Sequence, residues 1–311
     1  MVFLRAGSVI LLLSIVVGGC GFFGKRSSVR VDGSSTVYPI TEAVAEEFRK
    51  ERPEVRVTVG FSGTGGGFKK FSASEIDICD ASRPIKDSER EACAAAGVEF
   101  IELEVAFDGL AVIAHPENNW CDYLTVEQLK AIWQPESAVE KWSDVDPSWP
   151  DEPFKLYGPG TDSGTFDYFT EAICGEEDAS RSDYTASEDD NVLVTGVEGD
   201  KYSLGYFGYA YYEQNHDRLK LLAVDAGDGN RVLPSQATVR DNSYRPLSRP
   251  LYIYVRTSSL TNSDVADFVR FYLTNAAQLA PDVGYVAVPD EVDSRNLQRF
   301  NDALPAGPSA L

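Results

Sequence analysis

Three loops rich in glycine, serine and threonine precede predicted helices, and together they could bind an anion. Their sequences are VDGSSTV at 31–37, FSGTGGG at 61–67 and GTDSGTF at 160–166. The start of a helix exposes unpaired N–H groups and the positive end of the helix dipole, so a compact anion is favoured there. The alternative is that these residues serve only as helix caps and turns. Because Ser/Thr-Gly recurs in two of the loops, we favour a shared oxyanion site.

The elements that position these loops follow from hydrophobic spacing. Ile40, Val44 and Phe48 recur every four residues, which predicts a helix that opens near Thr36 and ends before Pro53. Strand-like runs alternate with such helices along the chain, and this order is typical of an α/β protein with mostly parallel sheets. The runs are VRVDG, VRVTVGF, LAVIAH, FKLYG and LYIYV.

A cationic side chain stands close to the second loop. In the stretch IDICDASRPI, residues 76–85, Asp80, Ser82 and Arg83 fall in the predicted turn between a strand and a helix. A guanidinium group can hold an oxyanion through two parallel hydrogen bonds. The alternative is a surface ion pair with one of the many acidic residues. The position of Arg83 beside the loops favours the binding role.

Composition limits the classes of partner and chemistry. The chain has 311 residues, 43% hydrophobic and 25% charged, with a net charge of -21, which indicates a soluble globular protein that binds neither nucleic acid nor an anionic membrane face. Backbone N–H groups attract an anion at contact distance, whereas salt screens the net negative charge of the chain at longer distances. An anion site of this kind is therefore compatible with the charge of -21. With only His115 and His216 and no C-x-x-C motif, we expect no metal, no cofactor and no catalytic triad.

The N-terminus reads as a targeting segment. The apolar run from Val9 to Val17 is too short to span a bilayer and is typical of a signal peptide. Its end, Val17 to Cys20, resembles the lipobox of bacterial lipoproteins, in which cleavage leaves the cysteine acylated by chains such as palmitate. We therefore expect a signal peptide at 1–19, a lipidated tether at 20–26, and anchoring on the periplasmic or cell-surface side of a membrane. Ordinary secretion with a spare Cys20 is the alternative.

Four further cysteines suit an oxidising compartment. An even number allows two disulfide bonds with three alternative connectivities. We favour Cys79–Cys93, because this bond closes a short loop, and Cys121–Cys174, because this bond would cross-link one later lobe.

Taken in order, several motifs resemble the periplasmic phosphate-binding protein of the Pst ABC transporter. They are DGSSTVYPITEAVAEEF, GFSGTGGGFKKF, IDICDASRPI, FDGLAVIAHPEN, LTVEQLKAIW, KWSDV, TDSGTF, LGYFGYAYY and RPLSRPLYIYV, and they cover nearly the whole mature chain. The resemblance implies a type II periplasmic-binding-protein fold, in which two α/β lobes joined by two crossover strands close on one phosphate. It places lobe one at 27–107 plus 248–311 and lobe two at 108–247, with crossovers near Phe107-Asp108 and Pro246-Leu247.

The resemblance also implies a set of phosphate ligands. Its members are donors in the three loops and in the turn beside them: Ser35, Thr36, Ser62, Thr64, Asp80, Ser82, Arg83, Ser163, Gly164 and Thr165. One well-known version of the pattern has an Arg four residues before the first serine of Ser-Gly-Thr, where this chain has Pro159, and an Asp where this chain has Arg83. We therefore expect Arg83 to supply the cation. A buried carboxylate that accepts the phosphate proton would exclude sulfate, and Asp80, then Asp162, are the candidates.

The function implied is binding without bond making or breaking. A lipid-anchored monomer would capture inorganic phosphate between its lobes and deliver it to an ABC permease. Alternatives are a binder of sulfate, molybdate or a phosphate ester, a phosphate sensor, and a phosphatase-like hydrolase that uses Ser163 or Thr165. The hydrolase is disfavoured because no base or metal cluster accompanies these hydroxyls.

Overall fold

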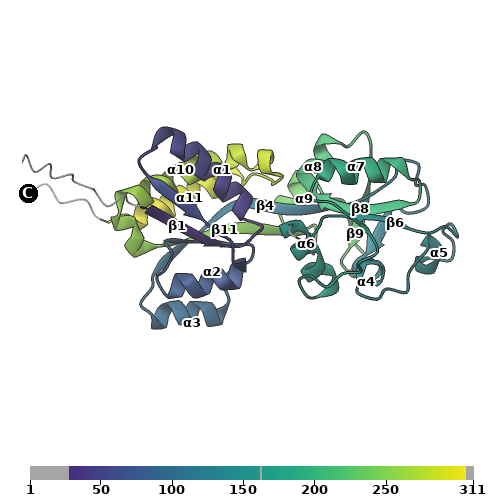
Figure 1. Cartoon of the computed structure of the whole chain (residues 1–311), viewed down its shortest axis with the longest axis horizontal. Helices are drawn as coiled ribbons and strands as arrows, with labels where there is room; N and C mark the ends of the chain where they lie inside the picture. Colours follow the sequence, from purple (N-terminus) through teal and green to yellow (C-terminus); the bar gives the residue numbers. More distant parts are fainter. Residues whose placement is uncertain (1–27, 162, 306–311) are drawn as a thin grey trace, which may run out of the picture.

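Two lobes lie side by side and are joined by two long strands (Figure 1). The computed structural model describes residues 28–161 and 163–305, so the predicted signal peptide and tether, with Cys20, and also Asp162 lie outside it. The strands are β1 Ser28–Gly33, β2 Arg56–Val59, β3 Ile78–Ala81, β4 Phe100–Ala114, β5 Tyr123–Thr125, β6 Lys155–Gly158, β7 Thr185–Ala186, β8 Ser203–Gly208, β9 Lys220–Asp225, β10 Arg231–Val232 and β11 Ser248–Arg256.

Helices cover both faces of the sheet in each lobe. They are α1 Tyr38–Glu51, α2 Gly63–Ser72, α3 Asp87–Ala95, α4 Val126–Trp133, α5 Trp142–Val145, α6 Gly164–Phe169, α7 Asp190–Gly199, α8 Tyr209–Gln214, α9 Gln236–Arg240, α10 Ser263–Leu279 and α11 Asp290–Ala303. A π-helical turn, Thr170–Cys174, continues α6, and 3-10 turns lie at Thr257–Thr261 and Pro281–Val283. In the described residues, no helix is long and apolar enough to cross a membrane.

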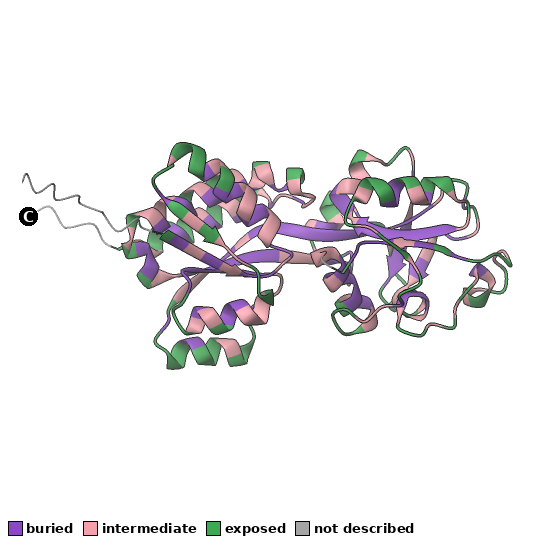
Figure 2. Cartoon of the chain, in the orientation of Figure 1, coloured by how far each residue is buried: buried purple, intermediate pink, exposed green. Residues whose placement is uncertain are grey.

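The sheet continues from one lobe into the other through β4. Its strand order is β2-β1-β3-β11-β4-β8-β6-β7, and β9 pairs with β4, β5 and β10. β4 pairs with β11 over residues 100–109 and with β8 over residues 110–114, and Figure 2 shows it as a buried strand that runs through both lobes. β11 returns from lobe two, so it runs antiparallel to both β3 and β4. The sheet is therefore mixed, rather than mostly parallel as the sequence predicted.

The core of lobe one forms two layers, one on each face of its sheet. α1 and α10 pack over one face through residues such as Phe48, Phe268 and Tyr272. α2 and α3 cover the opposite face, where Phe68 and Phe71 pack against Cys79. This two-sided cover fixes the starts of α1 and α2 beside the carboxyl ends of β1 and β3, where the predicted loops lie.

The two predicted disulfide bonds are absent, because all four cysteines that the structure describes are free thiols. Cys79 and Cys93 pack as apolar side chains in the same layer of lobe one. The thiol of Cys121 points at the carbonyl of Tyr123, 3.3 Å away, and Cys174 packs at the edge of the core of lobe two. Buried thiols often serve as small apolar groups in this way. The pairings Cys79–Cys93 and Cys121–Cys174 were therefore wrong.

A half-buried carboxylate at the start of α7 should make stability depend on pH. Burial, reinforced by Asp189 and Glu188, raises the pKa of Asp190 from 3.8 to about 6. The folded state then holds this proton more tightly than the unfolded state, so stability present below about pH 4 is lost as the pH rises through about 6. We expect Asp190→Asn to raise the unfolding free energy at pH 7.5 by about 2 kcal/mol, with little change at pH 3.5. Thermal melts at both pH values, with exposed Asp302→Asn as the control, measure this difference. An equal shift at both would contradict it.

Candidate functional site between the lobes

The loop before α1 touches the opposite lobe. The hydroxyl of Thr36 donates to the carbonyl of Gly164 at 3.3 Å, and the hydroxyl of Ser35 donates to the carboxylate of Asp167 at 3.1 Å. A Cβ on Gly164 would lie 2.8 Å from both Cα and Oγ1 of Thr36, so only glycine permits this approach. The starts of α1 and α6 therefore meet across the gap between the lobes.

Most of the glycine-rich stretch 61–67, which the sequence predicted as a loop, forms the first turns of α2, because this helix begins at Gly63. Ser62 donates its hydroxyl to Asp32 at 2.5 Å, and Thr64 accepts a hydrogen bond from the backbone N–H of Ser82 at 3.2 Å. A Cβ on Gly67 would lie 2.6 Å from the Cα of Gly33 on β1. Close packing of α2 on β1 therefore requires Gly67, and this glycine need not approach a ligand.

Backbone donors remain available at the starts of α1 and α2. Within the part of the chain that the structure describes, no group accepts a hydrogen bond from the N–H of Thr36, Val37, Gly63 or Thr64. At the start of α6, the hydroxyl of Ser163 accepts from the N–H of Thr165 at 3.2 Å and so caps its own helix. The free donors and the helix dipoles favour an anion at the junction of the lobes.

Arg83 is engaged within lobe one. Its guanidinium group donates two hydrogen bonds to the carboxylate of Glu89, at 2.8 and 2.9 Å, and a third to the carbonyl of Pro84 at 3.1 Å. This bidentate pair lies on a single lobe and uses the donors that the sequence interpretation assigned to an anion. The structure thus places Arg83 near the loops but with its charge already matched.

Asp80 lies inside lobe one. Its neighbours Cys79 and Ala81 face α2 and α3, so its own side chain faces the layer of α1 and α10. Neither carboxylate oxygen has a hydrogen-bond partner. Burial raises the pKa of this carboxyl well above its usual value, and the Thr41 hydroxyl opposes the rise in part. The backbone carbonyl of Asp80 accepts from the N–H of Ser34 at 2.9 Å, so this residue adjoins the first loop although its carboxyl faces the layer of α1 and α10.

A second arginine, which the sequence interpretation missed, lies at the junction itself. Arg249 on β11 donates from Nη2 to the hydroxyl of Thr36 at 2.9 Å, and its Nε lies 3.4 Å from a carboxylate oxygen of Asp108 on β4. The guanidinium group stacks on the ring of Tyr168, 3.5 Å from the ring centroid. Its side chain is 13% exposed and that of Asp108 is 2% exposed. This mostly buried cation therefore lies on one crossover strand, contacts the other through Asp108, and contacts both lobes through Thr36 and Tyr168.

Two aspartates at the junction, Asp108 and Asp167, have raised pKa values. Burial raises the pKa of Asp108, although the neighbouring Arg249 lowers it. Burial also raises the pKa of Asp167, against the hydrogen bond from Ser35. Both carboxyls therefore take up a proton more readily than an exposed aspartate. The sequence held a signal for Arg249 and Asp108, because each is the single charge within a largely apolar run, at 246–255 and 105–114. The structure pairs the two residues directly in the sheet.

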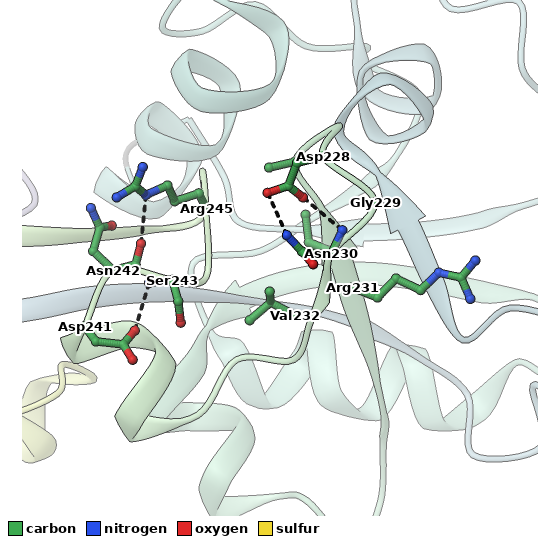
Figure 3. A pocket seen from close by; sticks show the side chains of 11 residues that line it. Asp228, Gly229, Asn230, Arg231, Val232, Asp241, Asn242, Ser243 and Arg245 are labelled. Carbon is green, nitrogen blue, oxygen red and sulfur yellow. Dashed lines mark hydrogen bonds between the residues drawn. The ribbon is translucent and has the colours of Figure 1, made fainter.

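A hollow of about 670 Å³ lies elsewhere, on lobe two between the β9–β10 turn and the segment after α9. Figure 3 shows that Asp228 turns back onto Asn230 and that Arg245 turns towards Asn242. Asp241 likewise accepts from the N–H of Ser243 at 2.9 Å. Since these polar groups satisfy their own turns, this hollow offers fewer convergent donors than the junction.

The family of the chain follows from comparison with known proteins. A model described as the PBP superfamily domain matches residues 24–276. The chain belongs to the PBP superfamily. Protein SphX of Synechocystis sp. is 49% identical over 293 residues, which are 93% of this chain and 87% of that protein. Phosphate-binding protein PstS of Staphylococcus saprophyticus is 38% identical over 305 residues, 96% of this chain and 94% of its own length.

A solved structure agrees with this membership of the PBP superfamily. The crystal structure of a possible phosphate binding protein from Planctomyces limnophilus has a TM-score of 0.86 and 48% identity, and the match covers 90% of this chain and 99% of that one. The predicted resemblance to the Pst-type members and the predicted two-lobed α/β fold are therefore confirmed. Members of this kind are transport binding proteins, which also confirms the prediction that the chain is no enzyme.

Proposed function

We propose that this protein captures inorganic phosphate at the junction of its lobes and delivers it to an ABC permease. The observation that carries the proposal is Arg249, a mostly buried cation that reaches Thr36 beside the free N–H groups of α1. A buried cation together with helix N-termini is suited to a small dehydrated oxyanion. Relatives named as phosphate-binding proteins support phosphate over the other oxyanions.

The proposed binding set keeps the loop residues and changes the cation. Donors come from the three loops and the turn after β3: Ser35, Thr36, Ser62, Thr64, Ser82, Ser163, Gly164 and Thr165. Arg249 replaces Arg83 as the principal cation, because Glu89 already neutralises Arg83. We propose lobes at 27–107 plus 248–311 and at 108–247, with the hinge where Asp108 pairs with Arg249. Acylation at Cys20 would hold the protein, as a monomer, on the outer side of a membrane.

Titration of the signal-less protein tests the ligand. The protein is stripped of bound anion by unfolding and refolding, then titrated calorimetrically with phosphate and, separately, with sulfate and molybdate. We expect one phosphate to bind per chain and sulfate to give no heat. Silence towards phosphate, or an equal response to sulfate, would overturn phosphate as the ligand.

Asp108 is the carboxylate we propose as acceptor of the phosphate proton, in place of Asp80. A deprotonated acceptor beside Arg249 attracts the proton that phosphate carries at neutral pH and repels sulfate, which has none. We expect Asp108→Asn to weaken phosphate binding by roughly tenfold or more and to admit sulfate, because Arg249 loses its countercharge. Competition calorimetry measures both affinities, and Asp80→Asn is the matched control. Unchanged discrimination in Asp108→Asn would remove Asp108 from this role.

A further inference from the structure

One pair of side chains crosses the gap between the lobes away from the hinge strands. Ser35 follows β1 of lobe one, and Asp167 lies in α6, on the side of lobe two that faces lobe one (Figure 1). The hydroxyl of Ser35 donates to a carboxylate oxygen of Asp167 at 3.1 Å. We call this hydrogen bond the latch. Because its two partners belong to different lobes, it exists only while the lobes are together.

Each partner of the latch is fixed to its own lobe. The loop before α1 is held against β3, because the N–H of Ser34 donates to the carbonyl of Asp80 at 2.9 Å. On the other side, α6 is anchored in the core of lobe two, where its Phe169 stacks on Tyr206 with 3.6 Å between the ring centroids. Neither partner can follow the opposite lobe when the lobes separate, so opening the gap must break the latch.

The latch uses the only proton that the Ser35 hydroxyl can donate. A serine hydroxyl carries one hydrogen atom, so a hydroxyl that donates to Asp167 has none left for an anion. Within the described residues, no group accepts a hydrogen bond from the backbone N–H of Ser35, and this group stays available to a ligand. The side chain of Ser35 thus serves closure, and its backbone serves the anion.

The carboxylate of Asp167 needs a donor from outside its own lobe. Three acidic side chains of lobe two interact with it electrostatically: Glu171, Glu177 and Asp178. The cation Arg249 opposes them. Among the hydrogen bonds of the described residues, the one from Ser35 reaches this carboxylate. Since a hydrogen bond to a charged group is stronger than one between neutral groups, lobe one supplies what this part of lobe two lacks.

We propose that Asp167 is a positioning residue that holds the lobes closed over the anion by accepting the hydroxyl of Ser35. This inference rests on the proposed function, because the bound anion is taken to be phosphate. Closure about a hinge brings the lobes together around a ligand, and the latch adds a contact that belongs to that state alone. It therefore slows opening, and with it the release of phosphate, without touching the ligand.

Ser35→Ala removes the latch without changing any charge. In stopped-flow measurements with phosphate, we expect the dissociation rate to rise about fivefold to tenfold, with the association rate unchanged because the latch forms after the anion has entered. Ser143→Ala is the matched control, since Ser143 on α5 donates its hydroxyl to Asp151 at 3.0 Å within lobe two. This control should leave both rates unchanged. Equal dissociation rates in wild type and Ser35→Ala would overturn the proposal.

A double-mutant cycle separates the latch from direct contact between the Ser35 hydroxyl and phosphate. Asp167→Ala removes the acceptor, and Ser35→Ala is then added to it. If the hydroxyl serves the latch, this second substitution changes the dissociation rate little. A rise as large as in the wild-type background would mean that the hydroxyl binds phosphate itself, and the latch would be refuted. Asp167→Asn is equally neutral but keeps an acceptor oxygen, so it should release phosphate more slowly than Asp167→Ala.

Small-angle scattering without phosphate gives a readout that does not depend on binding. We expect a larger radius of gyration for Ser35→Ala and for Asp167→Ala than for wild type, because both lose a contact of the closed state. Identical radii in all three proteins would contradict the latch. If wild-type protein fails to bind phosphate, the proposed function fails, while the scattering comparison still decides the role of Asp167.

Discussion

Replacing Arg249 with glutamine is expected to abolish measurable phosphate binding at micromolar protein. Arg249 is the mostly buried cation that contacts Thr36 and pairs with Asp108. Removing one member of a buried, hydrogen-bonded charge pair costs roughly 2–5 kcal/mol, which corresponds to roughly thirtyfold to several-thousandfold in affinity. Asp108 would also be left buried without its partner, so we expect the melting temperature to fall. Calorimetry and thermal melts measure the two effects.

The controls for this variant separate a site effect from a general charge effect. Arg231→Gln removes the same charge from the surface of lobe two, where Arg231 stacks on Tyr123, and should leave affinity unchanged. Arg83→Gln should weaken binding only slightly, because the Arg83 guanidinium is committed to Glu89. If Arg83→Gln abolished binding while Arg249→Gln did not, the cation assigned from the sequence would be the correct one.

Gly164→Ala is expected to weaken phosphate binding by about tenfold to a hundredfold, because it inserts a methyl group where the lobes meet. The new Cβ would lie 2.8 Å from Cα and 2.9 Å from the backbone N of Thr36, and backbone cannot turn away as a flexible side chain can. Overpacking of this kind typically costs 1–3 kcal/mol. Here the lobes can relieve it by staying apart, so the loss should appear in closure rather than in folding. Calorimetry gives the affinity, and scattering with phosphate gives the degree of closure.

A matched glycine tests whether the effect is local. At Gly199, the last residue of α7, an added Cβ meets nothing within 4 Å. Gly199→Ala should therefore bind phosphate as wild type does. A Gly164→Ala protein that bound and closed normally would show that the Thr36–Gly164 contact is dispensable.

Local patterns in the sequence predicted much of the fold. The spacing of Ile40, Val44 and Phe48 matches α1, which ends at Glu51 just before Pro53. Gly175 ends the π-helical turn that continues α6 and has φ 97°, the left-handed conformation in which glycine commonly ends a helix. These features depend on short-range periodicity and capping, which a single sequence displays directly. Strand direction was harder, because the antiparallel course of β11 depends on the chain returning from lobe two.

The sequence pointed to the loops that meet at the junction but not to the arginine that lies there. Helix starts are recognisable from Ser, Thr and Gly, so Thr36 and Gly164 could be placed at one site in advance. Whether an arginine is free to bind a ligand depends on which side chains pair with it in the fold. The partners of Arg249 lie 141 and 213 positions away in the sequence, so local patterns could not reveal them. The partner of Arg83, by contrast, is Glu89, only six positions away. The cysteine pairing failed for a related reason, because spacing alone cannot distinguish a bonded thiol from a packed one.

The position of β11 has a consequence for the order in which the molecule is made. In the sheet it lies between β3 and β4, although more than 150 residues of chain separate it from β3. Apart from Val286, Val288 and Val292, the core of lobe two is built from one continuous stretch, which can assemble as soon as it leaves the ribosome or the export channel. β1, β2 and β3 emerge earlier but must wait with an open sheet edge until β11 arrives. The N-terminal part of the chain is therefore expected to be the last to gain protection from hydrogen exchange. It is also expected to be the part most dependent on chaperones during export.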